Sequence, residues 1–280
     1  MNDIVTQGGP LGPLQCSVHI DKIGKEAIER DEYLYMYKNV KIPPLAMMDD
    51  LACLSKCGIE SIESNAFINS KIEQKKLKFN EGKCHQLHIG GTKNQNLNKN
   101  CPETRVHDKV IIKSNKDKYL GDIVTNDGKN HENIKERTTK GVGIVSSIIS
   151  ILKELYLGDL YFEAAILFRD TLFLSSILLN AESWVNLTKG DIEELETLDR
   201  TYLRRILEVP SSTPIPALYL ELGVIPISFI IQAKRIMFLH YLLTRNENEL
   251  LAKVLKAQID DPIKGDWVST VKEDLIGLVN

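Results

Sequence analysis

Two adjacent carboxylates interrupt the apolar stretch LAMMDDLACL at residues 45–54. A charge inside an apolar segment is costly to bury, so Asp49 and Asp50 must either lie in water or hold a partner. A tight turn between two short strands is one interpretation, because Asp is common in turns, where its side chain bonds its own backbone. A divalent metal is the other, because oxygen ligands suit hard cations such as Mg²⁺. The local spacing leaves both interpretations open.

Composition places the chain among ordinary globular proteins. It has 280 residues, of which 43% are hydrophobic and 26% charged, a length that suits about two domains. The formal net charge of −3 means that nucleic-acid binding would have to come from local clusters of Lys and Arg.

Cysteine usage and hydropathy bear on the compartment. The five cysteines are an odd number, and no apolar signal segment stands at the N-terminus. These features predict free thiols and an intracellular protein, without separating nucleus from cytoplasm. The most apolar window, residues 172–179, is much shorter than the ~20 residues of a spanning helix, so we expect no membrane insertion.

The first 130 residues alternate helical and strand-like patterns. Apolar spacing predicts helices over residues 14–30 and 59–79, the second ending in a lysine cluster that suits a helix C-terminus. The segments that resemble short strands are residues 33–42, 45–55, 86–89, 106–112 and 119–124.

Residues 131–280 change to long amphipathic helices. Thr188 stands at a predicted N-cap with Asp191 three positions later, and a short helix should begin at Pro216 and end at Gly223. The longer helices are expected over residues 133–157, 160–180, 191–209, 227–243 and 249–259. The sequence therefore predicts an α+β domain at 1–130 and an all-helical domain at 131–280.

Several segments occur in a suggestive order. Residues 6–14 (TQGGPLGPL) open a helix, residues 47–50 (MMDD) lie between apolar strands, and residues 77–84 (LKFNEGKC) close the next helix. In this order they resemble the second, third and fourth palm motifs of the reverse transcriptases of non-LTR (LINE-like) retrotransposons. Residues 118–121 (KYLG), followed by 126–128 (NDG), resemble the next strand pair, which in that family contacts the primer.

The resemblance continues through the second half of the chain. Residues 181–184 (AESW), 203–207 (LRRIL) and 221–226 (ELGVIP) are similar to segments that follow the polymerase core. The resemblance implies a truncated polymerase palm, with a short antiparallel sheet and helices, followed by an all-α thumb and connection domain. It also implies RNA-directed DNA polymerase chemistry with Mg²⁺ or Mn²⁺, an RNA template and a DNA primer.

The chemistry assigns roles to the matching residues. In nucleotide addition, two metal ions stabilise the attacking 3′-oxygen and the leaving pyrophosphate. By the resemblance, Asp49 binds metal directly, Asp50 is an auxiliary metal carboxylate, and Lys83 lies near the triphosphate and can protonate pyrophosphate. A solvated loop lysine is an equally open interpretation of Lys83.

A further set of residues would position substrate or template by the same resemblance. A glycine pair lets the backbone turn sharply and approach a bulky ligand. The residues in this set are Gln7, Gly8, Gly9, Pro10, Tyr119, Leu120 and Gly121.

Basic residues on two predicted helices could contact template and primer phosphates. They are Lys75, Lys76 and Lys78 on one helix and Arg200 and Arg204 on the other. Arg200 and Arg204 lie one turn apart and share a face, although a solvated helical face is the alternative interpretation.

Two departures from the family shape the expected activity. Met47 and Met48 replace the commonest aromatic-Ala pair, and the first palm motif, which supplies another metal-binding Asp, lies N-terminal to the Gln-Gly-Gly-Pro loop in that family. Because this chain starts six residues before that loop, we expect little or no polymerase activity from it alone. An exposed apolar sheet face near residues 33–42 would then favour self-association.

Alternative hypotheses come from other functional classes. One is a non-enzymatic remnant that binds nucleic acid or protein through its helical half, and another is an unrelated helical interaction protein in which the Asp pair is structural. Zinc is not expected, because the spacing of Cys53, Cys57, Cys84, His85 and His88 does not match a standard finger.

Overall fold

The computed structural model describes residues 12–30, 34–48, 50–75, 77–90, 103–106 and 109–279. The chain has a mixed α+β structure, as the sequence predicted at this coarse level. It forms two compact units, which we call the mixed unit (Met1–Asn115 with Asn248–Ala257) and the helical unit (Lys116–Glu247 with Gln258–Asn280). The boundary near residue 115 assigns the hairpin before the first long helix to the helical unit.

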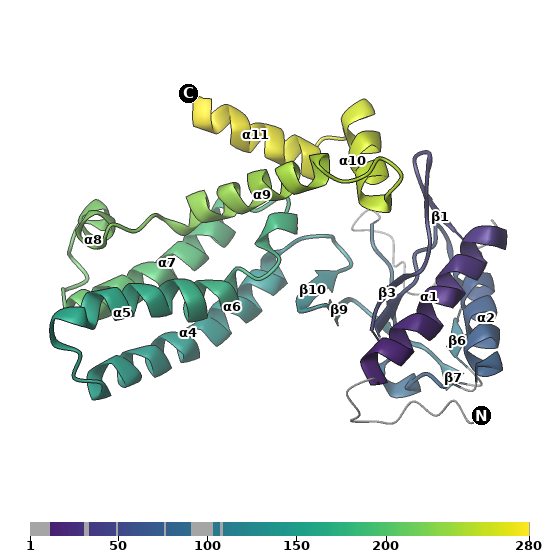
Figure 1. Ribbon diagram of the computed structural model, residues 1–280, viewed down its shortest axis with the longest axis horizontal. Coiled ribbons are helices and arrows are strands. Elements are labelled where there is room, and N and C mark those ends of the chain that lie inside the picture. The colour runs from purple at the N-terminus through teal and green to yellow at the C-terminus, as the bar shows by residue number, and fades with distance from the viewer. Residues whose placement is uncertain are drawn as a thin grey trace. The chain divides into compact units, whose positions relative to one another are not determined.

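The described part of the mixed unit consists of helices and a set of very short strands (Figure 1). Helix α10 (Leu250–Asp260) begins within the returning segment of this unit. The other elements are α1 (Gly12–Arg30), β1 (Tyr35–Tyr37), β2 (Val40–Ile42), β3 (Leu45–Met47), β4 (Asp50–Ala52), α2 (Gly58–Gln74), the 3₁₀ turn η1 (Glu81–Lys83), β5 (His85–Leu87), β6 (Arg105–Val106), β7 (Lys109–Val110) and β8 (Ile112–Ser114).

Each described strand of the mixed unit pairs with a single neighbour. The pairs β1–β2, β3–β4 and β6–β7 are antiparallel, and β5–β8 is parallel. The predictions of continuous strands over residues 33–42, 45–55 and 106–112 are therefore wrong. In the first case the chain folds back at Lys38, whose φ of +52° places it in the left-handed region used by tight hairpin turns.

A small core joins helices α1 and α2 of the mixed unit. Ile23 and Ala27, one turn apart on α1, are buried with Phe67, Ile68 and Ile72 of α2. This spacing places each set on one helix face, as amphipathic helices require.

Helix α2 ends earlier than the sequence indicated. It stops at Gln74, before the lysine cluster, because the chain turns so that Leu77 and Phe79 pack against the small core. The amide of Leu77 donates to the carbonyl of Ile72 across this turn (3.0 Å). The chain thus leaves the helix where the last turn was predicted, because leaving it buries two apolar side chains.

The helical unit contains a hairpin followed by a helical array (Figure 1). Its elements are β9 (Lys116–Tyr119), β10 (Asp122–Thr125), α4 (His131–Glu154), η2 (Gly158–Leu160), α5 (Tyr161–Phe168), the π-helical η3 (Arg169–Leu174), α6 (Ser175–Ile177), η4 (Ala181–Ser183), α7 (Lys189–Leu207), α8 (Ile215–Leu222), α9 (Ile227–Leu243) and α11 (Trp267–Val279).

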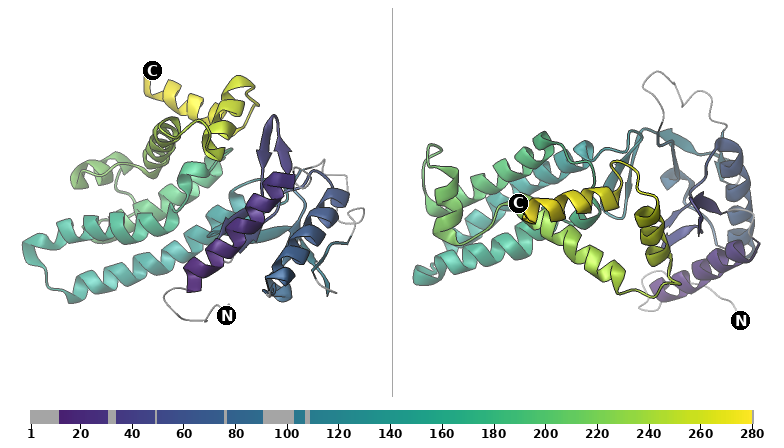
Figure 2. Two further views of the ribbon diagram at one scale, coloured as in Figure 1. Left: turned by 45° about the vertical axis from the view of Figure 1, so that its right-hand side comes forward. Right: turned by 90° about the horizontal axis from the view of Figure 1, so that it is seen from above.

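The long helices of this unit surround one extended core. Helices α4, α5 to α6 and α7 run side by side, while α9 packs on α7 and η4 and α11 packs on α9 (Figure 2). Buried side chains of α4, η3 and α7 meet in the centre, where the rings of Phe173 and Tyr202 stack with centroids 5.7 Å apart.

Local signals predicted several helix ends correctly. Thr188 is the N-cap of α7: its Oγ1 accepts from the amide of Asp191 (3.1 Å), and Asp191 Oδ2 accepts from the amide of Thr188 (2.9 Å). Helix α8 ends at Leu222, and Gly223 follows as its C-cap with a φ of +62°.

Other predictions for this half are wrong. Residues 160–180 do not form one regular helix, because α5 passes into the π-helical η3 and α6 ends at Ile177. Residues 119–124 are not one strand, because the chain turns at Leu120 and Gly121. Helix α11 was not predicted, although Asp266 caps its start by accepting from the amide of Ser269 (2.8 Å).

In the described residues, no single helix is long and apolar enough to cross a membrane; only the bent pair α8 and α9 meets that test, by length and composition.

Candidate functional site

The aspartate pair lies at a tight hairpin of the mixed unit. Strands β3 and β4 pair antiparallel with Met47 opposite Asp50, which leaves a two-residue turn between them. Met48, at the first position of this turn, has a φ of +55°, in the left-handed region that tight hairpin turns use. Asp49 lies outside the described residues.

Residues at the hairpin end are open to solvent. Met47 and Met48 are each more than half exposed, and Asp50 is exposed as well. Within the described part of the chain, the Asp50 carboxylate makes no hydrogen bond or ion pair. Its oxygens are therefore available to a cation or to water.

The other predicted residues of the mixed unit are dispersed over it. Lys83 is exposed on η1, Lys75 is the C-cap residue of α2, and Lys78 is exposed in the segment that follows α2. Among these described lysines, none forms a hydrogen bond or ion pair with Asp50. Gln7, Gly8, Gly9, Pro10 and Lys76 lie outside the described residues.

A second tight hairpin carries the predicted positioning residues of the helical unit. Tyr119 pairs with Asp122, so Leu120 and Gly121 form the two-residue turn, with φ values of +47° and +91°. These are the positive angles of a type I′ turn, which glycine adopts readily and leucine only at a cost.

The turn is held by one side chain of α4 and one from the segment between α6 and η4. Asn180 Nδ2 donates to the carbonyl of Leu120 (3.1 Å), and Arg137 Nη2 donates to the carbonyl of Gly121 (3.1 Å). Arg137 Nη1 also donates to the carbonyl of Ser176 (3.0 Å). Both backbone oxygens of the turn are therefore fixed relative to α4 and α6.

Asp122 is the centre of this brace. Its Oδ1 accepts from Arg137 Nη2 (2.6 Å) and Asn133 Nδ2 (2.8 Å), and its Oδ2 accepts from Asn180 Nδ2 (2.7 Å). Asn133 Oδ1 in turn accepts from the amide of Ile123 (3.2 Å). These residues could not be predicted from the sequence, because no local motif links positions up to 58 apart.

The predicted arginine pair on α7 is already engaged within the protein. The side chain of Arg200 is only 11% exposed, forms an ion pair with Glu193 and donates to Thr197 Oγ1 (2.9 Å). Arg204 Nη2 donates to the carbonyl of Thr213 (3.4 Å). These contacts hold both guanidinium groups against their own unit.

A buried polar network joins η3, α7, α8 and α9. Arg169 binds Asp199 through two parallel bonds, Nε to Oδ1 and Nη2 to Oδ2, both 2.8 Å. Tyr219 donates to Glu196 Oε2 (2.8 Å), and Glu196 Oε1 accepts from the amide (3.0 Å) and the hydroxyl (2.9 Å) of Ser228. Glu196 thus caps the first turn of α9, whose own N-cap is a proline.

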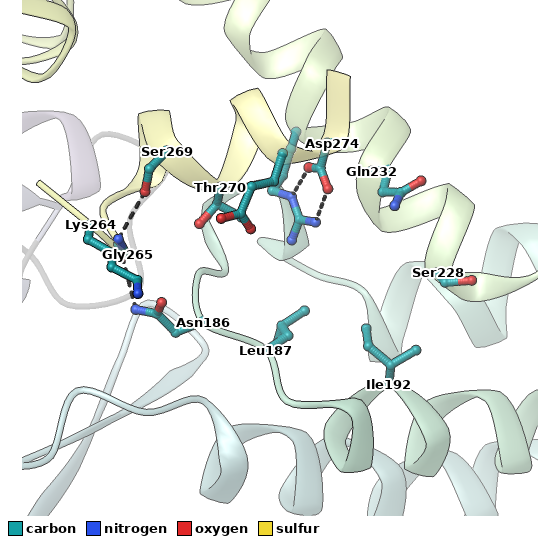
Figure 3. Close-up of a pocket in the computed structure, with 12 residues that line it drawn as sticks. Asn186, Leu187, Ile192, Ser228, Gln232, Lys264, Gly265, Ser269, Thr270 and Asp274 are labelled. Carbon is teal, nitrogen blue, oxygen red and sulfur yellow. Dashed lines mark hydrogen bonds and ion pairs between the residues drawn. The ribbon is translucent and has the colours of Figure 1, made fainter. Parts of the chain in front are cut away.

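A cavity of 510 Å³ lies between α9, α11 and the segment before α7 (Figure 3). Leu187 and Ile192 form an apolar side, while Lys264 and Gln232 lie near opposite ends. Its buried charges are already matched, because Arg235 Nε and Nη2 donate to the two carboxylate oxygens of Asp274 (2.6 and 2.8 Å).

The described residues contain no group of three His, Cys, Asp or Glu side chains placed to hold a metal ion. Cys53, Cys57 and Cys84 are free thiols. Cys53 packs against the small core of the mixed unit, and burial raises its pKa to about 12.

No family model matches the chain, and no significant match was found among curated proteins or solved structures.

Proposed function

We propose that the chain is the palm and thumb part of a reverse transcriptase of the non-LTR retrotransposon type, acting in metal-dependent DNA synthesis on an RNA template. The observation that carries the proposal is the tight β3–β4 hairpin, with Met47 opposite Asp50 and the turn between them. This geometry supports a catalytic carboxylate pair, because it sets Asp50 at an exposed hairpin end beside Asp49.

The donor set fits a divalent cation. The Asp50 carboxylate is exposed and makes no hydrogen bond or ion pair within the described part of the chain, and carboxylate oxygens are the ligands that Mg²⁺ prefers. Asp49 and Asp50 would hold the metal. When bound, the metal would stabilise charge on the attacking and leaving oxygens.

The β9–β10 hairpin supports primer positioning. A template–primer duplex is held by contacts that must not shift during the reaction, and a rigid support gives this precision. Arg137 and Asn180 fix the carbonyls of the Leu120–Gly121 turn, so the turn is held as such a support.

A second candidate is a non-enzymatic remnant that binds nucleic acid or protein through the helical unit. The observation that favours it is the size of the helical core, which includes buried residues from α4 to α9, whereas the mixed unit has a much smaller one. The helical unit carries neither aspartate of the pair and contains its own polar networks.

Primer extension tests both candidates. A labelled DNA primer on an RNA template is incubated with the full chain and Mg²⁺ or Mn²⁺, and binding of the same duplex is measured in parallel. The double variant Asp49→Ala, Asp50→Ala removes the pair, and Asp159→Ala, at an exposed position of η2, is the matched acidic control.

Each outcome decides between the candidates. Extension that is lost in the double variant but kept in Asp159→Ala supports the polymerase proposal. Duplex binding by all three proteins without extension supports the remnant. Neither extension nor duplex binding by the unmodified chain would overturn both nucleic-acid proposals.

A further inference from the structure

Helix α9 is apolar on two sides. One side carries Ile227 and Ile231, which lie in the core of the helical unit, where α7, η4 and α11 pack against the helix. The side that faces solvent is apolar as well, because every exposed residue of α9 except His240 is apolar or aromatic. A helix that is apolar all round is typical of a position that other elements cover completely.

The exposed residues form a continuous row. Phe229, Ala233, Met237 and Tyr241 follow one another at intervals of four along α9, and Ile225 extends the row just before the helix begins. Residues four apart are neighbours on a helix surface, and such rows are the ridges through which helices pack on one another. We call these five residues the apolar stripe.

The apolar stripe has enough area for a protein interface. Its four large residues, Ile225, Phe229, Met237 and Tyr241, are 55%, 54%, 72% and 43% exposed. At roughly 200 Å² for each large apolar side chain, these fractions amount to about 450 Å² on one copy of the chain. A standard interface buries about 800 Å² on each partner, of which a little over half is apolar. The stripe therefore supplies about the apolar area that one side of a dimer needs.

The apolar stripe carries no charge, which limits what it can bind. The charged neighbours on α9 are paired within their own unit, Lys234 with Glu182 (3.9 Å) and Arg235 with Asp274 (2.6 Å). Surfaces that bind nucleic acid and helices that lie on membranes both rely on Lys and Arg beside the contact. The apolar stripe instead fits a protein face that is itself uncharged.

The apolar stripe is complementary to itself. Ala233 stands at its centre, with Phe229 and Met237 four residues to either side and Ile225 and Tyr241 eight residues to either side. Around a two-fold axis at Ala233, an antiparallel second copy would place Met237 against Phe229. The small side chain of Ala233 lets the two helices approach closely at the axis, and sulfur–aromatic contact favours the pair of Met237 with Phe229.

Charges at the two ends of the stripe favour the antiparallel arrangement. Glu221 is exposed in the last turn of α8, at the end where Ile225 lies. The guanidinium of Arg245 lies 4.9 Å from the ring centroid of Tyr241, at the other end. An antiparallel pair brings the acidic end of each copy to the basic end of the other, whereas a parallel pair brings like charges together.

The beginning of the stripe is held by the helical unit. The carbonyl of Ile225 accepts from Arg169 Nη2 (3.0 Å), and Glu196 Oε1 accepts from the amide of Ser228, next to Phe229 (3.0 Å). Because this backbone is already fixed, association would cost little further ordering.

We infer that the chain forms a two-fold symmetric dimer in which the apolar stripes of two copies pack antiparallel, with Ala233 at the axis. The stripe belongs wholly to the helical unit and includes no residue of the β3–β4 or β9–β10 hairpin. The inference therefore goes beyond the proposed polymerase function and does not depend on it.

Reciprocal charge variants of the full chain test the inference. Sedimentation equilibrium from about 1 to 100 µM should show a dimer of the unmodified chain, since interfaces of this size can bind at micromolar concentration or tighter. Phe229→Glu and Met237→Lys should each weaken dimerisation tenfold or more, because each homodimer buries unpaired charges. An equimolar mixture of the two variants should dimerise at least tenfold more tightly than either alone, because the antiparallel heterodimer places the introduced carboxylate against the introduced ammonium.

A matched control changes an exposed apolar residue elsewhere on the same unit. Leu167 is 57% exposed on α5, outside the stripe, so Leu167→Glu should leave dimerisation unchanged. Far-ultraviolet circular dichroism of each variant checks that it is folded, and recovery in the mixture requires that both stripe variants are.

Three results would overturn the inference. The first is an unmodified chain that stays monomeric at the highest concentration, including one that binds phosphatidylcholine vesicles through the stripe instead. The second is dimerisation that neither stripe variant weakens, since another surface would then be in use. The third is a mixture that dimerises no more tightly than the single variants, which would exclude the antiparallel pairing of Phe229 with Met237.

Discussion

At the residue scale, His131 and Asp191 form a pair whose two members differ in exposure. The imidazole is largely open to solvent, the carboxylate is buried, and Nδ1 lies 2.9 Å from Oδ1. The hydrogen bond to Asp191 raises the pKa of His131 above its ordinary value. Burial by itself would raise the pKa of Asp191, but hydrogen bonds from His131 and Thr188 outweigh it and lower that pKa.

These directions fix the pH window in which the pair stabilises the fold. The histidine contribution is fully present below about pH 6.5 and is lost as the pH rises through its higher folded pKa. The aspartate contribution is present above about pH 3.9 and is lost as the pH falls through its lower folded pKa. The pair therefore contributes most between these two values.

We expect His131→Gln to remove the loss of stability that the unmodified chain shows as the pH rises above about 6.5. Urea unfolding measured across pH 4 to 9 checks this through the difference between the two proteins. A difference that does not change with pH would show that the imidazole charge has no part in stability.

At the element scale, α4 approaches the neighbouring helices at Gly141. A Cβ atom built there would lie 2.5 Å from Leu198 Cδ2 and 3.0 Å from Ile177 Cγ2, both of them core side chains. Gly143, two positions later on the same helix, has open space around it. Both glycines have the same low helix propensity, but only Gly141 is required by the packing of neighbouring side chains.

Alanine at these positions should have opposite effects. Gly143→Ala should stabilise the chain by up to about 1 kcal/mol, the difference in helix propensity. Gly141→Ala gains the same propensity but overpacks the core, at about 1 to 3 kcal/mol, and so should destabilise it overall. Urea unfolding measures the free energy of unfolding of each variant and so checks the sign of its change. Equal changes in the two variants would refute the close contact at Gly141.

The same scale shows which elements could be predicted from sequence. Helix ends with local chemistry, such as the Thr188 cap and the Gly223 stop, were predicted correctly because the signal lies within a few residues. Strand reversals were not, because the alternation of Tyr33, Tyr35 and Tyr37 is compatible with a strand of any length. The π-helical η3 begins at Arg169, whose partner Asp199 is 30 residues away and so lies outside any local pattern.

For the candidate site, the sequence offered a turn at the aspartate pair but predicted neither the turn at Leu120–Gly121 nor its support. A turn at Asp50 is favoured by the residue type itself, whereas residues 119–124 read as one strand. The brace of Asp122 with Arg137 and Asn180 requires long-range packing that no local pattern contains. The metal and nucleic-acid roles of these residues stay predictions.

At the scale of the whole molecule, the two units differ in how much apolar surface they bury. The large core of the helical unit and the small core of the mixed unit have no residue in common. Stability scales with buried apolar area, so the mixed unit should be the less stable of the two. Both tryptophans, Trp184 and Trp267, belong to the helical unit.

Unfolding should therefore occur in two steps. Far-ultraviolet circular dichroism reports both units and should begin to change at lower urea than tryptophan fluorescence, which reports the helical unit. Ile68→Ala should lower the free energy of unfolding of the first step only, and Ile148→Ala that of the second step only. Each decrease should be about 2 to 5 kcal/mol. Superimposable curves from the two probes would show a single cooperative structure.

The returning segment Asn248–Ala257 has a consequence for how the chain can be divided. The polypeptide passes between the two units at residues 115–116, 247–248 and 257–258, so no single cut separates them. Within the mixed unit, Lys38 Nζ donates to the carbonyl of Ala257 (3.0 Å). A protease that cuts the chain near residue 115 leaves residues 248–257, which belong to the mixed unit, on the same fragment as the helical unit, and a truncation at residue 247 would remove part of both units. Isolating the helical unit intact therefore requires a recombinant chain in which residues 248–257 are replaced by a short linker.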